Sequence, residues 1–269
     1  MWYNGNCRVN NEFREKGVGE GMEKNKIYTL RKYLSGSVHD IENLSRIQIS
    51  CVAPKLFNDP VDTYFYYSDA KCFIESKKIL TYDIMNMIRI SCFINHANII
   101  KKKKDSKLSS SEILMWTHYA NSHKGICLEF SVPAEKFDYL DKNRFDENKV
   151  FLNPIYYQEN LATDFESIFS DMEDDTYSKD NFEELLRTCF FTKDKSFSYE
   201  DEIRLLKYTD MIDNNYIPFK FNYFTKVIFG KRCEEDMKYL VQCLNKQVYK
   251  NKLELYEIND HFQEVRYGK

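Results

Sequence analysis

Glycine and proline are scarce in this chain of 269 residues, which contains 8 of the first and 5 of the second. Neither GxGxxG nor GxxxxGK[ST] occurs in the sequence. Because those motifs cradle phosphate groups, their absence removes the main support for a Rossmann dinucleotide-binding fold and for a P-loop enzyme. The low content of both residues also argues against a long disordered linker.

Paired cysteines and long apolar runs are absent as well. The 8 cysteines are scattered without any CxxC pair. Because a signal peptide is lacking too, we expect a reduced, cytoplasmic protein. No apolar run approaches the roughly 18–20 residues that span a bilayer, so no membrane partner is expected. Zinc is not expected, since His118 and His123 have no accompanying cysteine pair.

The charge and size of the chain narrow the classes further. A net charge of −3 and a pI of about 6.0 give no electrostatic reason for non-specific binding to duplex nucleic acid. With 43% hydrophobic residues the chain can build a sizeable core. We expect residues 1–24 to form a polar extension, in which Met22 could be the native start. Residues 25–269 then form a single domain with a helical insertion around 160–192.

Hydrophobic periodicity predicts an α+β fold: a mixed, mostly antiparallel sheet core with inserted helices. Strands are expected at 26–31, 46–52, 88–93, 124–130, 199–206, 225–230 and 253–258. Helices are expected at 37–45, 109–120, 181–191 and 234–246. Ser109 and Glu112 have the spacing of a capping box at the start of one helix. Gly125, in the turn after that helix, is expected to adopt the left-handed conformation.

The segment around 197–206 carries the most informative pattern. Glu200, Glu202 and Arg204 recur at a spacing of two inside an apolar, aromatic run. On a strand, all three side chains point to the same face. Two neighbouring carboxylates destabilise a half-buried strand unless a cation or a ligand lies between them. The pattern therefore predicts a functional cleft; the alternative is a helix, in which Glu200 and Arg204 form a surface pair worth about 0.2–0.5 kcal/mol.

Four segments together carry a resemblance to a known family. They are IYTLR at 27–31, FNDP at 57–60 with Asp62, MWTHY at 115–119 through HKGIC at 123–127, and Lys193 followed by Phe197 and YEDEIR at 199–204. In this order and spacing they resemble the domain of unknown function 2971 family of bacteria and phages, over roughly residues 26–230. Phe197 departs from that pattern, where Trp is more usual, but an aromatic ring is retained.

The pattern of that family is in turn similar to the ADP-ribosyltransferase fold. The resemblance implies an NAD site in which the first strand holds the cofactor, an aromatic loop clamps the nicotinamide and a late Glu-x-Glu strand carries catalysis. It assigns catalysis to Glu202 and Glu200. The implied cofactor-binding residues are Arg31, Tyr28, Asn58, Asp59, Trp116, His118, Tyr119 and Arg204. The chain lacks the Ser-Thr-Ser motif of the second strand; residues 48–50 are the nearest counterpart.

Cleavage of the nicotinamide–ribose bond develops positive charge on the ribose, as in glycoside hydrolysis. Glu202 would favour that state by accepting a hydrogen bond from the ribose 2′-OH. Glu200 would orient or deprotonate the acceptor. Arg31 would make a bidentate contact with the pyrophosphate.

Simpler interpretations remain open for several of these residues. Arg31 could be a surface cation, and His118 a buried core histidine. Asn58 and Asp59 precede a proline, where such residues are common turn formers. The lysine run 101–104 is interpreted as a solvated loop rather than a phosphate site.

We therefore expect an enzyme that cleaves NAD, its substrate, and transfers ADP-ribose to a protein, a nucleic acid or water. Such an enzyme could be a toxin or an anti-phage effector with a cognate regulatory or antitoxin protein. A non-catalytic nucleotide- or protein-binding module is the main alternative. A metal-dependent nuclease is a third, in which Glu200, Glu202 and Asp59 hold Mg²⁺.

Overall fold

The structure, a computed structural model, describes residues 27–57, 87–96, 107–133, 150–159, 190–209 and 215–268. Its strands are β1 (Ile27–Leu34), β2 (Gln48–Ser50), β3 (Ile88–Asn95), β4 (Ile126–Pro133), β5 (Val150–Pro154), β6 (Tyr156–Gln158), β7 (Thr192–Asp194), β8 (Glu202–Tyr208), β9 (Tyr216–Pro218), β10 (Phe224–Phe229), β11 (Glu254–Ile258) and β12 (Glu264–Arg266). Its α-helices are α2 (Val38–Ser45), α6 (Ser110–Tyr119) and α9 (Glu235–Gln247), and its 3₁₀ helices are η1 (Pro54–Leu56), η4 (Lys195–Glu200) and η5 (Phe221–Tyr223).

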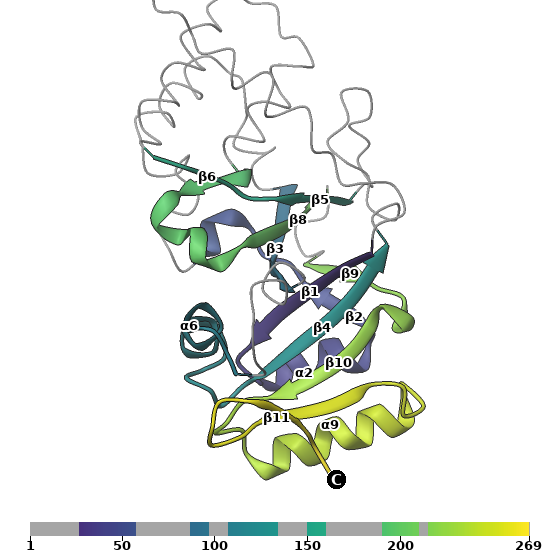
Figure 1. The fold of residues 1–269 in the computed structure, drawn as a ribbon. Helices are drawn as coiled ribbons and strands as arrows, with labels where there is room; N and C mark the ends of the chain where they lie inside the picture. Colours follow the sequence, from purple (N-terminus) through teal and green to yellow (C-terminus); the bar gives the residue numbers. More distant parts are fainter. Residues whose placement is uncertain are drawn as a thin grey trace, which may run out of the picture.

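An eight-stranded sheet forms the centre of the fold, in the order β12-β11-β10-β4-β1-β3-β8-β5 (Figure 1). Neighbouring strands are antiparallel except β10 and β11, which are parallel. Two small sheets, β2–β9 and β6–β7, complete the strands. The predicted α+β class with a mostly antiparallel sheet is confirmed. None of the described helices is long and apolar enough to cross a membrane.

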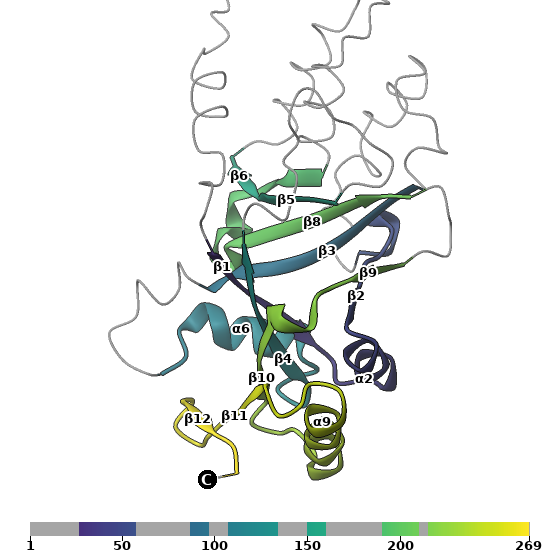
Figure 2. The same ribbon diagram turned by 90° about the vertical axis from the view of Figure 1, so that its right-hand side faces the viewer.

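The large sheet is split between β1 and β3. β1 pairs with β4 along its whole length, from Ile27 to Leu34, but with β3 only at Leu30 and Arg31. Beyond Arg31 the two strands separate, and β3 and β8 run across β1 and β4 at a wide angle (Figures 1 and 2). The split leaves room between the two halves of the sheet for a cavity.

Helices cover both faces of the half-sheet β1–β4–β10. Figure 2 shows α6 on one side of these strands and α2 and α9 on the other. Side chains such as Leu128, Phe130 and Val241 form the core on the α2 and α9 side. Trp116 and Ile228 belong to a second cluster on the α6 side. Because residues alternate along a strand, each strand supplies both clusters.

Most of the predicted elements that the structure describes are present, with corrected ends. Strand 46–52 is reduced to β2, which pairs with β9, and the end of the predicted segment contacts the large sheet only through a bridge between Val52 and Ile90 of β3. The predicted extension 1–24 lies outside the described residues, as do most of the predicted insertion 160–192 and the lysine run 101–104.

The turn between α6 and β4 corrects the prediction for Gly125. Asn121, Ser122 and His123 have positive φ angles, of 48°, 53° and 68°, whereas Gly125 does not. Gly125 is instead needed for close approach, since a Cβ there would lie 2.0 Å from the Leu34 carbonyl oxygen. A larger residue would push α6 and its side chains away from β1.

The predicted capping box at the start of α6 is present. Ser109 Oγ accepts a hydrogen bond from the Glu112 backbone N–H at 3.2 Å, and Glu112 Oε2 accepts one from the Ser109 backbone N–H at 2.8 Å. The helix thereby fixes Glu112 against β1 and carries Tyr119 at its other end.

Ser109→Ala is expected to lower the free energy of unfolding by about 1 kcal/mol, because one orphan N–H of α6 loses its acceptor. Ser110→Ala, one position into the helix, is the matched control and is expected to change stability by less than about 0.5 kcal/mol. Urea denaturation of both variants measures the difference. Equal effects of the two substitutions would contradict the capping role.

Candidate active site

A cavity of about 330 Å³ lies where β1 and β3 separate. Its walls come from five parts of the chain: β1, the segment from β2 to η1, β3, α6, and the segment from β7 to β8. The lining residues are Arg31, Lys32, Tyr33, Ser50, Val52, Leu56, Phe57, Ile90, Cys92, Phe93, Ile94, Met115, Tyr119, Lys193, Glu200 and Glu202. Ligand pockets in proteins usually have volumes of about 300–1,000 Å³, so this cavity lies at the lower end of that range.

Glu200 and Glu202 reach this cavity together, but not from one strand. The predicted strand 199–206 is wrong at its beginning: Glu200 ends η4, and β8 begins at Glu202. Asp201 between them has φ 45° and ψ 50°, the left-handed conformation, which Asp adopts more readily than most residues. The regular alternation of a strand was expected to bring the two carboxylates to one face. The turn at Asp201 brings them together instead, around one cation.

That partner is Lys193, at the centre of a buried group of charges. Its Nζ lies 2.6 Å from Glu200 Oε2 and 3.4 Å from Glu202 Oε2. Arg204 Nε donates to Glu202 Oε1 at 2.7 Å, and all four side chains are buried. Two cations therefore balance two carboxylates. The sequence pattern includes Lys193 but predicts no role for it. Two adjacent buried carboxylates do require a nearby cation, and this requirement was the available signal.

The surroundings shift the pKa values of the two carboxyl groups in opposite directions. Burial raises the pKa of Glu200, and the neighbouring charge of Glu202 adds to the effect. Burial acts in the same sense on Glu202, but Arg204 and Lys193 outweigh it and lower the pKa of Glu202 to about 2. Glu202 is thus ionised at neutral pH, while Glu200 is the group that takes up a proton more easily.

Tyr119, at the end of α6, forms a hydrogen bond with one member of the acid pair, which consists of Glu200 and Glu202. Its Oη donates a hydrogen bond to Glu200 Oε1 at 2.9 Å, and the residue lines the cavity while 39% of its surface is exposed. Burial of the hydroxyl and the charge of Glu200 raise the pKa of Tyr119 well above its usual value. The hydroxyl therefore remains a donor.

Tyr119→Phe is expected to raise the pKa of Glu200 further, because the lost hydrogen bond favours the ionised carboxylate. Carboxyl ¹³C NMR titration of parent and variant measures the shift. Tyr157→Phe is the control, since Tyr157 Oη accepts from the Glu202 backbone N–H at 2.9 Å instead. If the pKa of Glu200 is instead lower in Tyr119→Phe, the Tyr119 hydroxyl does not stabilise the carboxylate.

Arg31 lines the cavity, yet its guanidinium is turned toward carboxylates. It donates to Glu129 Oε2 from Nε at 2.9 Å and from Nη2 at 2.7 Å, and to Glu264 Oε2 from Nη2 at 2.9 Å. Glu112 Oε1 lies 3.5 Å from Nη1. With an exposed fraction of 1%, Arg31 is not the surface cation of the simpler interpretation. Its contact with a pyrophosphate stays a prediction and would compete with these bonds.

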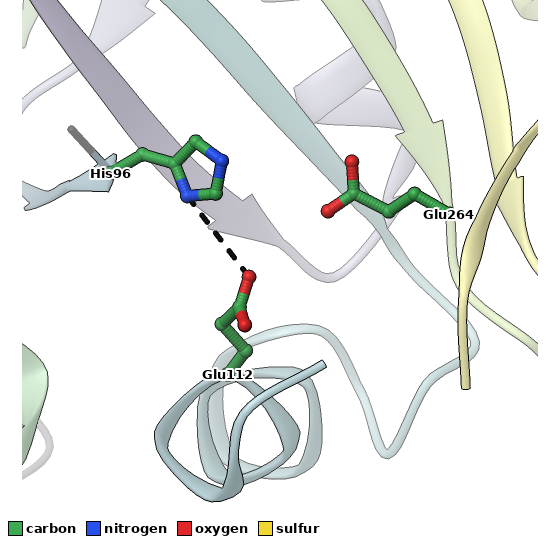
Figure 3. A group of neighbouring side chains, drawn as sticks. All are labelled: His96, Glu112 and Glu264. Carbon is green, nitrogen blue, oxygen red and sulfur yellow. Dashed lines mark ion pairs between the residues drawn. The ribbon is translucent and has the colours of Figure 1, made fainter. Parts of the chain in front are cut away.

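Three side chains converge beside Arg31: His96, which directly follows β3, Glu112 of α6 and Glu264 of β12 (Figure 3). Their ligand atoms lie within 4.8 Å of one another, close enough to approach a common metal ion. Arg31 already supplies positive charge to both carboxylates. The arrangement is therefore explained as an ion cluster around Arg31, which also ties β12 to β1.

Among the residues that the structure describes, the other predicted cofactor residues do not line the cavity. Tyr28 is buried in the α2 and α9 core, and Trp116 packs at right angles to Tyr33 with ring centroids 5.1 Å apart. His118 is exposed beside Tyr119, which corrects its interpretation as a core histidine. Arg204 lies behind the cavity wall, bound to Glu202 and to the Phe190 carbonyl. Asn58 and Asp59 lie outside the described residues.

No curated protein and no solved structure matches this chain. One family model matches residues 115–205; it is described as "Protein of unknown function (DUF2971)". The matched segment contains Tyr119, Lys193 and the acid pair, but neither β1 nor the C-terminal strands. Over about a third of its length, the part that supplies most of the charged cavity wall, the chain is similar to the DUF2971 family. The resemblance predicted for roughly 26–230 is thus confirmed over 115–205, and the segments at 27–31 and 57–60 lie outside the match.

Proposed function

We propose that the protein cleaves the nicotinamide–ribose bond of NAD in this cavity, in the manner of an ADP-ribosyltransferase. One observation carries the proposal: Glu200 and Glu202 face one cavity with pKa values displaced in opposite directions. Such a divergence is typical of carboxyl groups that perform different steps of one reaction. The split sheet, with the first strand on one side and the Glu-x-Glu segment on the other, is in keeping with the resemblance.

In the proposed mechanism Glu202 is the permanent anion. It accepts a hydrogen bond from the ribose 2′-OH, and the attraction grows as the ribose becomes positively charged while nicotinamide leaves. Arg204 and Lys193 keep this carboxylate ionised and fix its direction. Glu200 then removes the proton of the attacking hydroxyl, amine or water. Its raised pKa makes it a stronger base than an ordinary carboxylate.

For this reaction Lys193 must loosen its contact with Glu200 so that the acceptor can approach. Tyr119 remains hydrogen-bonded to the other oxygen and can hold the carboxyl group in place. We place Lys193 and Tyr119 as positioning residues of the acid pair. The acceptor, the proposed toxin or anti-phage role and a regulatory protein stay predictions.

The experiment is to incubate the parent protein with NAD and to follow nicotinamide release, first in water and then with candidate protein and nucleic-acid acceptors. Release that depends on Glu202 supports NAD cleavage, and labelled ADP-ribose on an acceptor identifies a transferase. Lack of release in all conditions would overturn the proposed reaction.

A binding module without catalysis is the second candidate, favoured by the charge balance of the site. Lys193 and Arg204 already neutralise both carboxylates, so the group is stable without a ligand. NAD or nucleotide binding without turnover would support this function. The metal-dependent nuclease has less support, because the oxygens of Glu200 and Glu202 face Lys193 and Arg204. Its third expected ligand, Asp59, lies outside the described residues.

A further inference from the structure

Lys32 is a cation of the cavity that has uncharged partners. It follows Arg31 on β1 and lines the cavity beside Cys92. Its Nζ donates to Ser91 Oγ at 2.9 Å and to the Cys92 carbonyl oxygen at 3.2 Å. Among the residues that the structure describes, no carboxylate forms an ion pair with this ammonium group.

Within the described part of the chain, the other three cations around the cavity are paired with carboxylates. Arg31 binds Glu129 and Glu264, while Lys193 and Arg204 share the acid pair. Lys32 is half-buried, and its Nζ lies 5.3 Å from the centroid of the Phe93 ring, which attracts the charge without neutralising it. A cation withdrawn from water without an anion is unfavourable, so proteins retain one where an anion is supplied from outside or where a polar contact demands it. The split sheet explains the contact with the Cys92 carbonyl. It does not require a charged donor there, because a neutral one would serve.

We propose that Lys32 is the anion-binding group of the cavity and holds a phosphate of the ligand. The inference deepens the proposed function and rests on it for the identity of that phosphate, the pyrophosphate of NAD. Lys32 stands on β1, on one side of the split, and the acid pair stands at η4 and β8, on the other. NAD has matching chemistry, since its pyrophosphate is anionic, whereas its ribose hydroxyls and cationic nicotinamide suit carboxylates.

The pKa of Lys32 is expected to change when an anion binds, because it depends on the charges that surround the ammonium group. Burial lowers the pKa of Lys32, and the groups that oppose this effect are Cys92, Asp40 of α2, Cys51 and Glu202 across the cavity. A bound phosphate adds negative charge and raises that pKa, so binding is accompanied by proton uptake. Affinity is therefore expected to decrease as the pH rises and the free lysine loses its proton. An arginine at this position stays charged and removes that dependence.

The test is calorimetric titration of inorganic pyrophosphate into the full chain and three variants, in two buffers with different ionisation enthalpies. Lys32→Met should bind about ten- to a hundredfold more weakly, the range for one charge-assisted hydrogen bond. Lys32→Arg should bind like the parent but with less proton uptake, because only the protons of pyrophosphate itself are then exchanged. Lys231→Met is the control, because Lys231 pairs with Asp260 outside the cavity and should leave binding and uptake unchanged. Circular dichroism verifies the fold of each variant.

Pyrophosphate affinity of the parent weaker than about 1 mM, or equal affinity of Lys32→Met, overturns the assignment. If Lys32→Met does not fold, Lys32→Arg decides: proton uptake equal to that of the parent overturns the assignment. The two proposals fail separately. Pyrophosphate binding through Lys32 without nicotinamide release rejects NAD cleavage alone. Nicotinamide release with an unchanged KM for NAD in Lys32→Met rejects the role of Lys32 alone.

Discussion

Glu202→Gln is expected to slow nicotinamide release by about 10²–10³-fold, the usual effect of losing one group aimed at transition-state charge. The amide keeps the size of the side chain and still accepts a hydrogen bond, so NAD should bind with a similar Kd. What is lost is the negative charge whose attraction grows as the ribose becomes cationic. Single-turnover measurements of nicotinamide release, with Kd determined separately, distinguish the two effects.

Glu200→Gln is the matched control at the neighbouring position. It should impair transfer to an acceptor more than hydrolysis, because its proposed role concerns the nucleophile. Either substitution leaves Lys193 and Arg204 with a single carboxylate, so both are expected to destabilise the fold. A loss of stability common to both variants therefore cannot explain why one slows nicotinamide release and the other slows transfer to the acceptor. Equal losses of activity and of stability in both variants would mark the pair as structural, and unchanged turnover in Glu202→Gln would reject the mechanism.

Local signals in the sequence predicted much of the fold. The capping box at Ser109 and the helical spacing of apolar residues located α6 and α9, since both signals lie within one element. The split of the sheet left no such signal. It arises where β1 stops pairing with β3, and it depends on how strands far apart in sequence diverge.

The acid pair shows the same limit at the level of the site. The spacing predicted that Glu200, Glu202 and Arg204 face one cleft. The two carboxylates do line one cavity, whereas Arg204 does not. The reason also differs from the expected one, because a left-handed Asp201 separates Glu200 from the strand that begins at Glu202. The need for a cation between them followed from charge alone, whereas its identity as Lys193 required the fold. Trp116 was misjudged for a related reason: a large aromatic side chain on a short helix suits a cofactor site and a core equally well.

The ion cluster around Arg31 was the least predictable feature, because its members come from β1, β4, α6 and β12. It also changes the interpretation of the first strand. Arg31 was expected to hold the pyrophosphate, yet its donors are engaged by carboxylates. The adjacent Lys32 has no such partner among the described residues. The two neighbouring cations of β1 thus have different roles in this proposal: Arg31 stabilises the fold and Lys32 binds the ligand.

Arg31→Met is accordingly expected to lower the free energy of unfolding by about 3–5 kcal/mol, because it leaves buried carboxylates without their cation. Chemical denaturation at neutral pH measures the loss. Lys226→Met is the control, since Lys226 is more exposed and pairs with Glu129 alone, at 3.2 Å; its loss should be smaller.

The pH dependence of the Arg31→Met effect gives a second measurement. Burial opposes the charge of Glu264, but Arg31 outweighs it and lowers the pKa of Glu264 below its value in the unfolded chain. A lowered folded-state pKa contributes stability above the unfolded value, about 4.3, and that contribution is lost as the pH falls further. The difference between parent and Arg31→Met should therefore shrink below about pH 4. If Arg31→Met instead cost less than about 1 kcal/mol while abolishing pyrophosphate binding, Arg31 would be the phosphate ligand and the division of roles with Lys32 would be reversed.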